Sequence, residues 1–269
     1  MTNPVSNTAF YCGGVRMQDA LHDDPLVGDR YAERLMGEDG RRLFEPFAGQ
    51  RNPNGINVTR HRIIDDMLRE RFKGNPLRLA VVIGTGLDTR PFRMATGRWV
   101  EFDEAPIIER KERLLPSATC LVPLTRIPID FAHESLADKL APWATNDRVS
   151  VVMEGVMMYL DEAAISETCR TLFDLMPNHT LICDLMSEKF LRRYGGDMQK
   201  LIEQMGAKFK WVPKRPLDLF EYLGYRKSMQ VSIAQRAATW DAISAPPWIV
   251  KNFLPTLRDG FGVYALKGD

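Results

Sequence analysis

The sequence predicts an α/β fold built on a mostly parallel sheet with helices on both faces. Short apolar segments alternate with amphipathic ones between residues 78 and 185, which is typical of strand–helix units. Runs such as Leu-Ala-Val-Val-Ile contain no polar residue, as expected for strands buried on both faces. The chain has 269 residues, 45% of them hydrophobic, which suffices for one large α/β domain or two small ones.

The elements follow in a simple order. Residues 51–55, Arg-Asn-Pro-Asn-Gly, predict a turn, and the apolar spacing of residues 58–72 predicts a helix. Further helices are expected at 106–115 and 162–175. Strands are expected at 78–84, 99–103, within 119–129, and at 149–153, 179–185, 225–231 and 261–266. Because parallel sheets bind ligands at the carboxyl ends of their strands, the residues after each strand are the first candidates for a site.

Composition and charge exclude several classes of protein. Lys and Arg total 36 and Asp and Glu total 35, so the net charge of +1 argues against a general nucleic-acid binder. The four cysteines and four histidines are dispersed, and no metal site is expected. Neither a signal peptide nor an apolar run approaching 18 residues is visible. We expect a cytoplasmic protein without a membrane partner.

One segment, residues 187–227, interrupts the alternation of strands and helices. It holds ten basic and five acidic residues, so its net charge is +5 while the rest of the chain carries −4. Such an insertion beyond the fifth strand could cover an anionic substrate, with Arg192, Arg193, Lys208 and Lys210 as candidate contacts. A solvated helical hairpin is the equally weighted alternative.

Candidate ligand-binding residues occur at the strand ends. Gly84 and Gly86 let the backbone approach a ligand closely, but the third glycine of a dinucleotide fingerprint is absent. The pair therefore fits a nucleotide, S-adenosylmethionine (SAM) or a tight turn. Asp103 stands where an acidic residue commonly accepts hydrogen bonds from ribose hydroxyls, and its alternative role is to cap the next helix.

Acidic residues also stand at the ends of the third, fourth and fifth strands, at Asp130, Glu154 and Asp184. Their common place at one sheet edge predicts a pocket for a cationic ligand that is rich in hydroxyl groups and bears an amine. Arg60 lies on the inward face of the helix 58–72, where an arginine needs a buried anion such as a methionine carboxylate. Its alternative role is that of an arginine whose charged end reaches solvent.

In combination, these motifs resemble the leucine carboxyl methyltransferase-type family of SAM-dependent methyltransferases, and within it the tetracenomycin-type O-methyltransferases. The matching segments are Val58-Thr-Arg-His-Arg62 with Asp65-Asp66, Gly84-Thr-Gly-Leu-Asp-Thr-Arg90, Val100-Glu-Phe-Asp103 with Lys111, Ile127-Pro-Ile-Asp-Phe131 and Glu154-Gly-Val-Met-Met-Tyr-Leu160. The GxGxDTR and EGxxxYL motifs are specific in this order and spacing.

The resemblance implies a class I methyltransferase (Rossmann-like) fold. Its seven-stranded, mostly parallel sheet would have a reversed last strand, with an N-terminal helical cap over residues 1–76, a SAM-binding domain over 77–269 and a helical lid at 187–227. By resemblance, Arg60 binds the methionine carboxylate, and Gly84 and Gly86 lie under the methionine portion. Asp103 takes the ribose, Asp130 and Phe131 flank the adenine, and Glu154 closes the site.

The expected activity is O-methylation of a small anionic metabolite by direct, in-line methyl transfer. Because the methyl group of SAM is already activated, the protein is expected to supply mainly proximity and alignment. A carboxylate acceptor needs no base, whereas a phenol gains from one, for which His61, His133 and Tyr159 are weak candidates. Three alternatives remain: methylation of a protein C-terminal carboxylate, a NAD-dependent oxidoreductase and a non-catalytic SAM-binding protein. The oxidoreductase is disfavoured because no Tyr-x-x-x-Lys pair accompanies Asp103.

Overall fold

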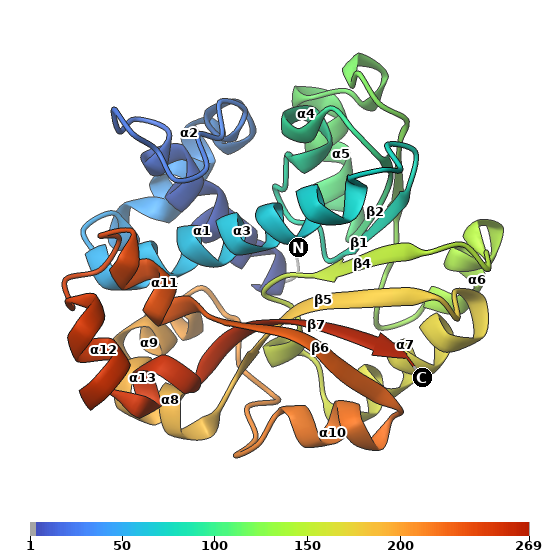
Figure 1. Cartoon of the computed structure of the whole chain (residues 1–269). Helices are drawn as coiled ribbons and strands as arrows, with labels where there is room; N and C mark the ends of the chain where they lie inside the picture. Colours follow the sequence, from blue (N-terminus) through green and yellow to red (C-terminus); the bar gives the residue numbers. More distant parts are fainter. Residues whose placement is uncertain (1–3, 269) are drawn as a thin grey trace.

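A seven-stranded sheet forms the centre of the protein (Figure 1). The computed structural model describes residues 4–268, apart from the side chains of residues 4–6 and 197. The strand order is β3-β2-β1-β4-β5-β7-β6, with β7 antiparallel to both of its neighbours and the pairs from β3 to β5 parallel. The strands are β1 (Leu79–Ile83), β2 (Arg98–Asp103), β3 (Leu124–Pro128), β4 (Val149–Met153), β5 (His179–Met186), β6 (Tyr225–Ser232) and β7 (Phe261–Gly268). The expected fold class, including the reversed last strand, is confirmed.

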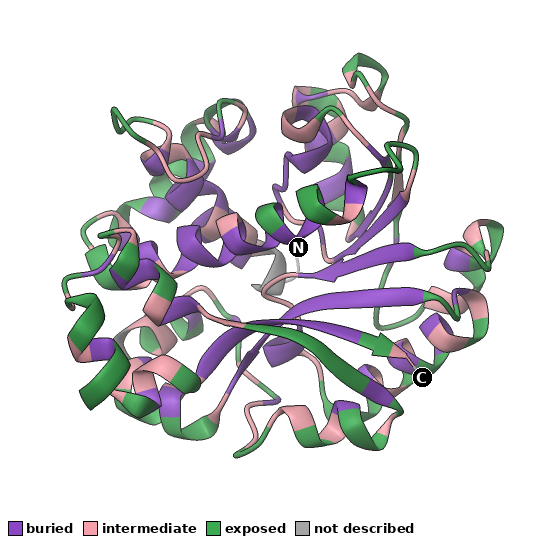
Figure 2. Cartoon of the chain, in the orientation of Figure 1, coloured by how far each residue is buried: buried purple, intermediate pink, exposed green. Residues whose placement is uncertain are grey.

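The inner strands are buried on both faces because alternate side chains enter two separate cores. In β1, Leu79, Val81 and Ile83 belong to one hydrophobic cluster, while Ala80 and Val82 belong to another. Every residue of β1, β4 and β5 is buried, and Figure 2 shows these strands as the continuous interior of the molecule. Burial on both faces explains the unbroken apolar run of β1, whereas β4 and β5 also bury a few polar residues, namely Ser150, His179, Thr180 and Asp184.

Helices cover both faces of the sheet. Helices α6, α7 and α10 contribute to the first cluster, whereas α3, α8, α9 and α11 contribute to the second. The helices are α1 (Pro4–Asp19), α2 (Ala32–Phe44), α3 (Arg51–Phe72), α4 (Arg90–Met94), α5 (Ala105–Leu114), α6 (Leu136–Leu140), α7 (Glu162–Leu175), α8 (Glu188–Tyr194), α9 (Gly196–Gln204), α10 (Leu217–Tyr222), α11 (Ile233–Thr239), α12 (Pro247–Phe253) and α13 (Pro255–Asp259). Short 3₁₀ turns lie at η1 (Glu45–Phe47), η2 (Ser117–Thr119), η3 (Ala141–Trp143) and η4 (Met157–Tyr159). None of the helices within residues 4–268 is long and apolar enough to cross a membrane.

The turn expected at residues 51–55 is wrong, because these residues form the start of α3. Pro53 is tolerated in the first turn of a helix, where its missing N–H leaves no hydrogen bond unmade. Gly55 is required by packing rather than by a turn: a Cβ there would lie 1.9 Å from the carbonyl oxygen of Ala242. Helix α3 thus begins in close contact with the segment before α12.

Helix α3 packs on the sheet through one apolar face. Ile63, Ile64, Met67 and Leu68 join the hydrophobic cluster that contains Val82 of β1. In Figure 1, α1, α2 and α3 lie together beside the upper left part of the sheet. The division into residues 1–76 and 77–269 stays a prediction, and its ends, residues 1–3 and 269, lie outside the described residues.

Candidate active site

A large cavity lies at the carboxyl ends of the parallel strands. Its volume is about 1370 Å³, and segments that follow β1 to β5 line it together with parts of α1, α3, α8 and α9. All seven cofactor-binding candidates line the cavity: Arg60, Gly84, Gly86, Asp103, Asp130, Phe131 and Glu154. The topology thus brings together residues that lie up to 94 positions apart in the chain.

The loop after β1 presents bare backbone to the cavity. Gly84 has φ of 71° and Gly86 φ of 49°, a region that side chains disfavour. A Cβ on Gly84 would lie only 2.6 Å from Cγ2 of Val156, and one on Gly86 would lie 3.1 Å from Cβ of Ala9. Both backbone conformation and close packing therefore require glycine at these two positions.

Asp103, at the end of β2, orients this loop. Its Oδ2 accepts a hydrogen bond from the Gly86 amide at 2.6 Å, and its Oδ1 accepts one from the Glu104 amide at 2.8 Å. Burial raises the pKa of Asp103 to about 6, although these two amides act in the opposite direction. No side chain caps α5, so the alternative role of Asp103 as its cap is not supported.

Asp130 and Phe131 stand at the exposed rim of the cavity, after β3. Asp130 accepts hydrogen bonds from the Ala132 amide at 2.9 Å and from Nδ1 of His133 at 2.8 Å. The hydrogen bond from His133 lowers the pKa of Asp130 and raises that of His133. The Phe131 side chain is 40% exposed, which leaves an apolar ring at the rim.

Arg60 and Glu154 form the opposite, buried end of the site. Nε of Arg60 donates to Oε1 of Glu154 at 3.1 Å, and Nη1 donates to Oδ2 of Asp184 at 3.2 Å. Burial alone lowers the pKa of Arg60, but Asp184 and Glu154 outweigh burial and hold it well above its usual value. Arg60 is 6% exposed, so the alternative of a charged end in solvent is not supported.

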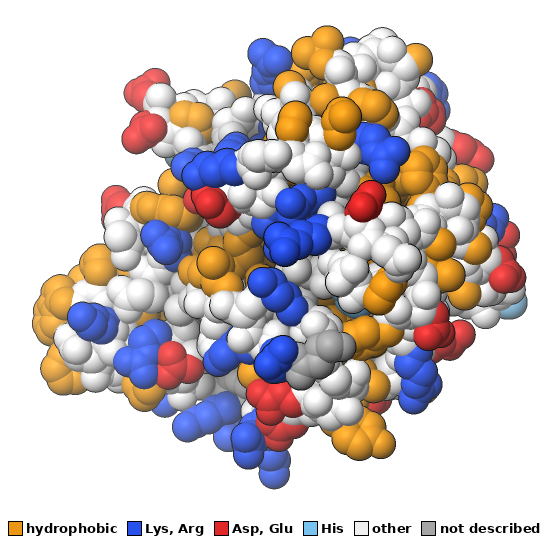
Figure 3. Space-filling view, turned by 45° about the vertical axis from the view of Figure 1, so that its right-hand side comes forward, with side chains coloured by type: hydrophobic (Ala, Val, Ile, Leu, Met, Phe, Trp, Pro, Cys, Tyr) orange, Lys and Arg blue, Asp and Glu red, His pale blue; other side chains and the backbone are white. Residues whose placement is uncertain are grey.

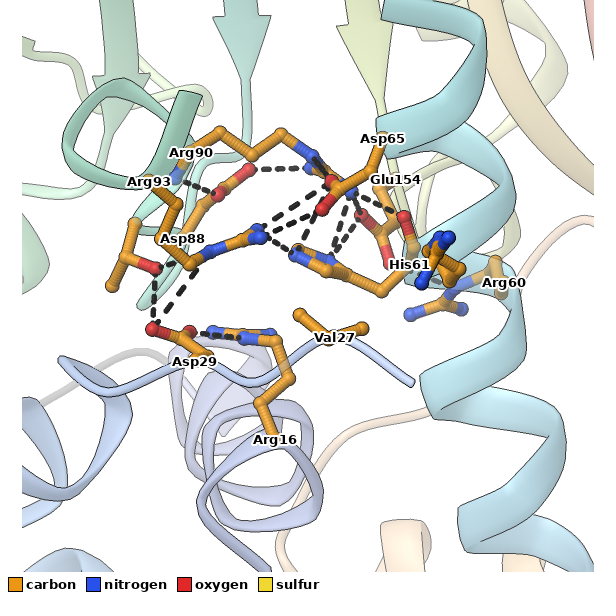
Figure 4. Close-up of polar contacts among 12 residues, drawn as sticks. Arg16, Val27, Asp29, Arg60, His61, Asp65, Asp88, Arg90, Arg93 and Glu154 are labelled. Carbon is orange, nitrogen blue, oxygen red and sulfur yellow. Dashed lines mark hydrogen bonds and ion pairs between the residues drawn. The ribbon is translucent and has the colours of Figure 1, made fainter. Parts of the chain in front are cut away.

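A buried charge network surrounds Glu154 and joins α3 to the segments that follow β1 and β4 (Figure 4). Arg90 is fully buried and donates to Asp65 at 2.6 Å, to Asp88 at 2.5 Å and to Glu154 at 2.7 Å. Arg93 donates to the second oxygen of Asp65 at 2.6 Å. No individual role was predicted for Asp65, Asp88, Arg90 and Arg93, although a carboxylate among the apolar residues of α3 and an arginine directly after a glycine loop both indicate buried partners.

His61 is part of this network, and its ring nitrogens are both engaged. Nε2 lies 2.6 Å from Nη2 of Arg93, which can only donate, so Nε2 accepts and Nδ1 donates to Oε2 of Glu154 at 3.0 Å. Nη2 of Arg90 also lies 2.9 Å from Nδ1, but it donates to Glu154 and to the His61 carbonyl. Burial and Arg90 lower the pKa of His61, and no lone pair of its ring is left to accept a substrate proton.

The other two candidate bases lie in contrasting places. Tyr159 is buried, and its ring centroid lies 5.4 Å from that of Phe209. Burial raises the pKa of Tyr159, so its hydroxyl stays protonated at neutral pH. His133 is exposed at the rim. Both side chains line the cavity.

The lid segment, residues 187–227, presents mainly apolar side chains to the cavity, contrary to the expectation of a basic covering. Arg192, Arg193 and Lys208 are exposed and do not line it, whereas Lys210 does. Helix α8 buries Phe190, while both of its arginines are exposed. The lining residues of the segment, apart from Gly195 and Lys210, are Phe190, Leu191, Tyr194, Met198, Ile202 and Phe209.

Figure 3 shows that Lys and Arg side chains reach the surface of one face in several separate groups among hydrophobic and uncharged ones. Within the described residues, no group of three or more His, Cys, Asp or Glu side chains is arranged to hold a metal ion.

Known proteins are similar to this chain in sequence. The sequence model of the leucine carboxyl methyltransferase family matches residues 13–173, more than half of the chain. The tetracenomycin polyketide synthesis O-methyltransferase TcmP of Streptomyces glaucescens is 27% identical over 252 residues, covering 90% of this chain and 89% of that protein.

Solved structures share the fold at low sequence identity. A DUF574 family protein of Streptomyces avermitilis has a TM-score of 0.59 at 14% identity, covering 95% of this chain and 97% of that chain. Magnesium protoporphyrin IX methyltransferase of Synechocystis PCC 6803, solved with bound S-adenosylhomocysteine (SAH), has a TM-score of 0.52 at 11% identity, with coverage of 87% and 96%. On the family match, the chain belongs to the leucine carboxyl methyltransferase family of SAM-dependent methyltransferases.

Proposed function

We propose that this methyltransferase O-methylates a small, largely apolar molecule that carries a carboxylate or an acidic hydroxyl. The observation that carries the proposal is the apolar lining that the lid segment contributes to the cavity. An aromatic acceptor fits such a wall, because flat apolar rings bury much surface at a small entropic cost. The related tetracenomycin enzyme is named for polyketide synthesis, which points in the same direction.

The proposed cofactor placement follows the strand order. Asp103 would accept hydrogen bonds from the ribose hydroxyls, and Asp130 and Phe131 would flank the adenine at the rim. Gly84 and Gly86 would lie under the methionine portion, where an added Cβ has no room. Arg60 would bind the carboxylate, and Glu154, which already holds Arg60, would close this end. The residues present therefore fit a SAM-sized group.

The proposed chemistry asks little of the protein. Bound SAM supplies an electrophilic methyl group. The chain's own residues hold the two reactants in line and exclude water from the apolar side of the cavity. Because the ring nitrogens of His61 are engaged and Tyr159 stays protonated, these two residues do not serve as bases. The third candidate, His133, lies at the exposed rim, where it is hydrogen-bonded to Asp130. The absence of a base among the buried candidates favours an acceptor group that is already ionised at neutral pH.

Lys210 is the predicted basic residue of the lid segment that lines the cavity. Its backbone amide donates to the Met158 carbonyl at 2.8 Å, which holds this part of the segment against η4. We propose that its ammonium group attracts the ionised group of the acceptor. The helices within residues 1–76 and the lid segment would together form the acceptor side.

The proposal is tested by methyl transfer from deuteromethyl-labelled SAM to a panel of acceptors, followed by mass spectrometry. The panel contains 1-hydroxy-2-naphthoate, 2-naphthol, succinate and a peptide with a free C-terminal leucine. We expect label on an oxygen of a naphthalene compound and none on succinate or the peptide. Preferred labelling of the peptide would instead support a protein carboxyl methyltransferase, and preferred labelling of succinate would contradict the apolar acceptor.

A further inference from the structure

A side-chain oxygen of α3 is buried at the cavity without a hydrogen-bond partner. Asn57 is 7% exposed and lines the cavity, and its Oδ1 accepts no hydrogen bond. A buried amide oxygen left unpaired is costly and uncommon in folded proteins. Its position in a ligand cavity suggests that a ligand supplies the missing donor.

The sulfur of Cys12 lies beside the amide nitrogen of Asn57. Nδ2 donates to Sγ of Cys12 at 3.3 Å, and Nη2 of Arg60 donates to the same sulfur at 3.6 Å. Asn57 and Arg60 lie three residues apart, on one face of α3. The free oxygen of Asn57 therefore belongs to the end of the cavity where Arg60 and Glu154 lie.

The charges at this end favour a cation. The single guanidinium of Arg60 contacts two carboxylates, Glu154 and Asp184. The oxygens of these carboxylates already accept from Arg60, from the ring of His61, from Arg90 and from the Gly155 amide. A cationic donor entering here meets two carboxylates whose hydrogen-bond partners are protein groups, and Asn57 Oδ1 is an acceptor without a competing partner.

We propose that Asn57 Oδ1 accepts a hydrogen bond from the α-ammonium group of the cofactor's methionine portion. Arg60 and Asn57 would then hold the two ends of one amino-acid group, the carboxylate and the ammonium. Asn57 is thus a specificity residue that recognises the amino-acid part of the cofactor. The inference rests on the proposed cofactor placement but not on the proposed acceptor.

The test compares two ligands by isothermal titration calorimetry, without acceptor or turnover. One ligand is SAH, and the other is deamino-SAH, in which hydrogen replaces the ammonium group. Asn57→Leu, which is nearly the same size, should raise the Kd of SAH about ten-fold and change that of deamino-SAH less than two-fold. Asn57→Ala should show the same contrast if the leucine variant is poorly folded, as judged by thermal melting.

Asn54→Leu is a matched control. Asn54 lies one turn earlier on α3, is also 7% exposed and also has an unpaired Oδ1, but it does not line the cavity. Its substitution should leave both Kd values unchanged. An unchanged Kd for SAH in Asn57→Leu, or an equal loss for the two ligands, would overturn the role of Asn57. Failure of the wild-type protein to bind either ligand would instead overturn the cofactor placement.

Discussion

The affinity for SAH should depend on pH through Asp103. Burial raises the pKa of this carboxyl group to about 6 in the ligand-free protein. If the ionised carboxylate accepts the ribose hydroxyls, a ligand must bind the ionised form and lose affinity as Asp103 becomes protonated. With a pKa of about 6, the Kd should be roughly ten-fold higher at pH 5 than at pH 8, equivalent to ~1.4 kcal/mol.

Folding stability should change in the opposite direction. The pKa of Asp103 is raised above its unfolded value, so its stabilising contribution is fully present below about pH 4 and is lost as pH rises through about 6. Relative to an Asp103→Asn variant, the ligand-free protein should therefore gain ~1.4 kcal/mol of unfolding free energy between pH 8 and pH 5. Acid thus strengthens the contribution of Asp103 to folding while it weakens its contribution to binding.

Calorimetric titration with SAH from pH 5 to pH 8 measures the first effect, and urea unfolding measures the second. Repeating the titration in buffers of different ionisation enthalpy should reveal proton release on binding near pH 6. The Asp103→Asn variant should bind more weakly at pH 8 and lose most of the pH dependence. A wild-type Kd that stays constant over this range, or a variant with the same pH profile, would refute the role assigned to Asp103.

Substitutions at Arg60, Gly84 and Phe209 test other parts of the site. Arg60→Lys should keep most of the folding stability but raise the Kd of SAH at least ten-fold, since one ammonium group cannot replace the guanidinium fork. Arg60→Ala should lower the free energy of unfolding in urea by about 3–5 kcal/mol, because it leaves buried carboxylates without their partner. Equal stability of the two variants would contradict this. Gly84→Ala should lower the melting temperature and abolish SAH binding, because its Cβ would lie 2.6 Å from Val156 in a backbone region of positive φ. Normal SAH binding in calorimetry would contradict the role of this glycine loop in cofactor binding. Phe209→Ser should raise the KM of a naphthoate acceptor several-fold and leave the SAH affinity unchanged. Arg193→Ala, which lies outside the cavity, should change neither quantity. The reverse pattern in steady-state kinetics would instead support an acceptor site lined by basic residues.

The sheet could be predicted because its strands carry a strong local signal. Strands β1, β4 and β5 are buried on both faces, so most of their residues are apolar, and β1 is an unbroken apolar run. The acidic residues at the strand ends could be predicted to share one edge from the parallel topology alone. The segment at 51–55 gave a false turn signal, because Gly55 serves a contact with Ala242 that is distant in sequence.

The partners of the buried charges could not be predicted, because they depend on packing between distant elements. Arg90 follows β1, yet its carboxylate partners include Asp65 on α3 and Glu154 after β4. The prediction of a basic lid was wrong for a related reason, because the net charge of a segment does not show which face of a helix lines the cavity. In α8 the arginines lie on the exposed face, while Phe190 and Tyr194 line the cavity.

A crystal structure with SAH and 1-hydroxy-2-naphthoate tests the central claim most directly, because it locates the acceptor. We predict that the naphthalene ring lies against Tyr194 and Phe209. The ionised group of the acceptor should point toward Lys210, and one acceptor oxygen should face the SAH sulfur. A ring bound outside the cavity, beside Arg192 and Arg193, would contradict the apolar acceptor site, as would an acceptor group held by the arginines of α8.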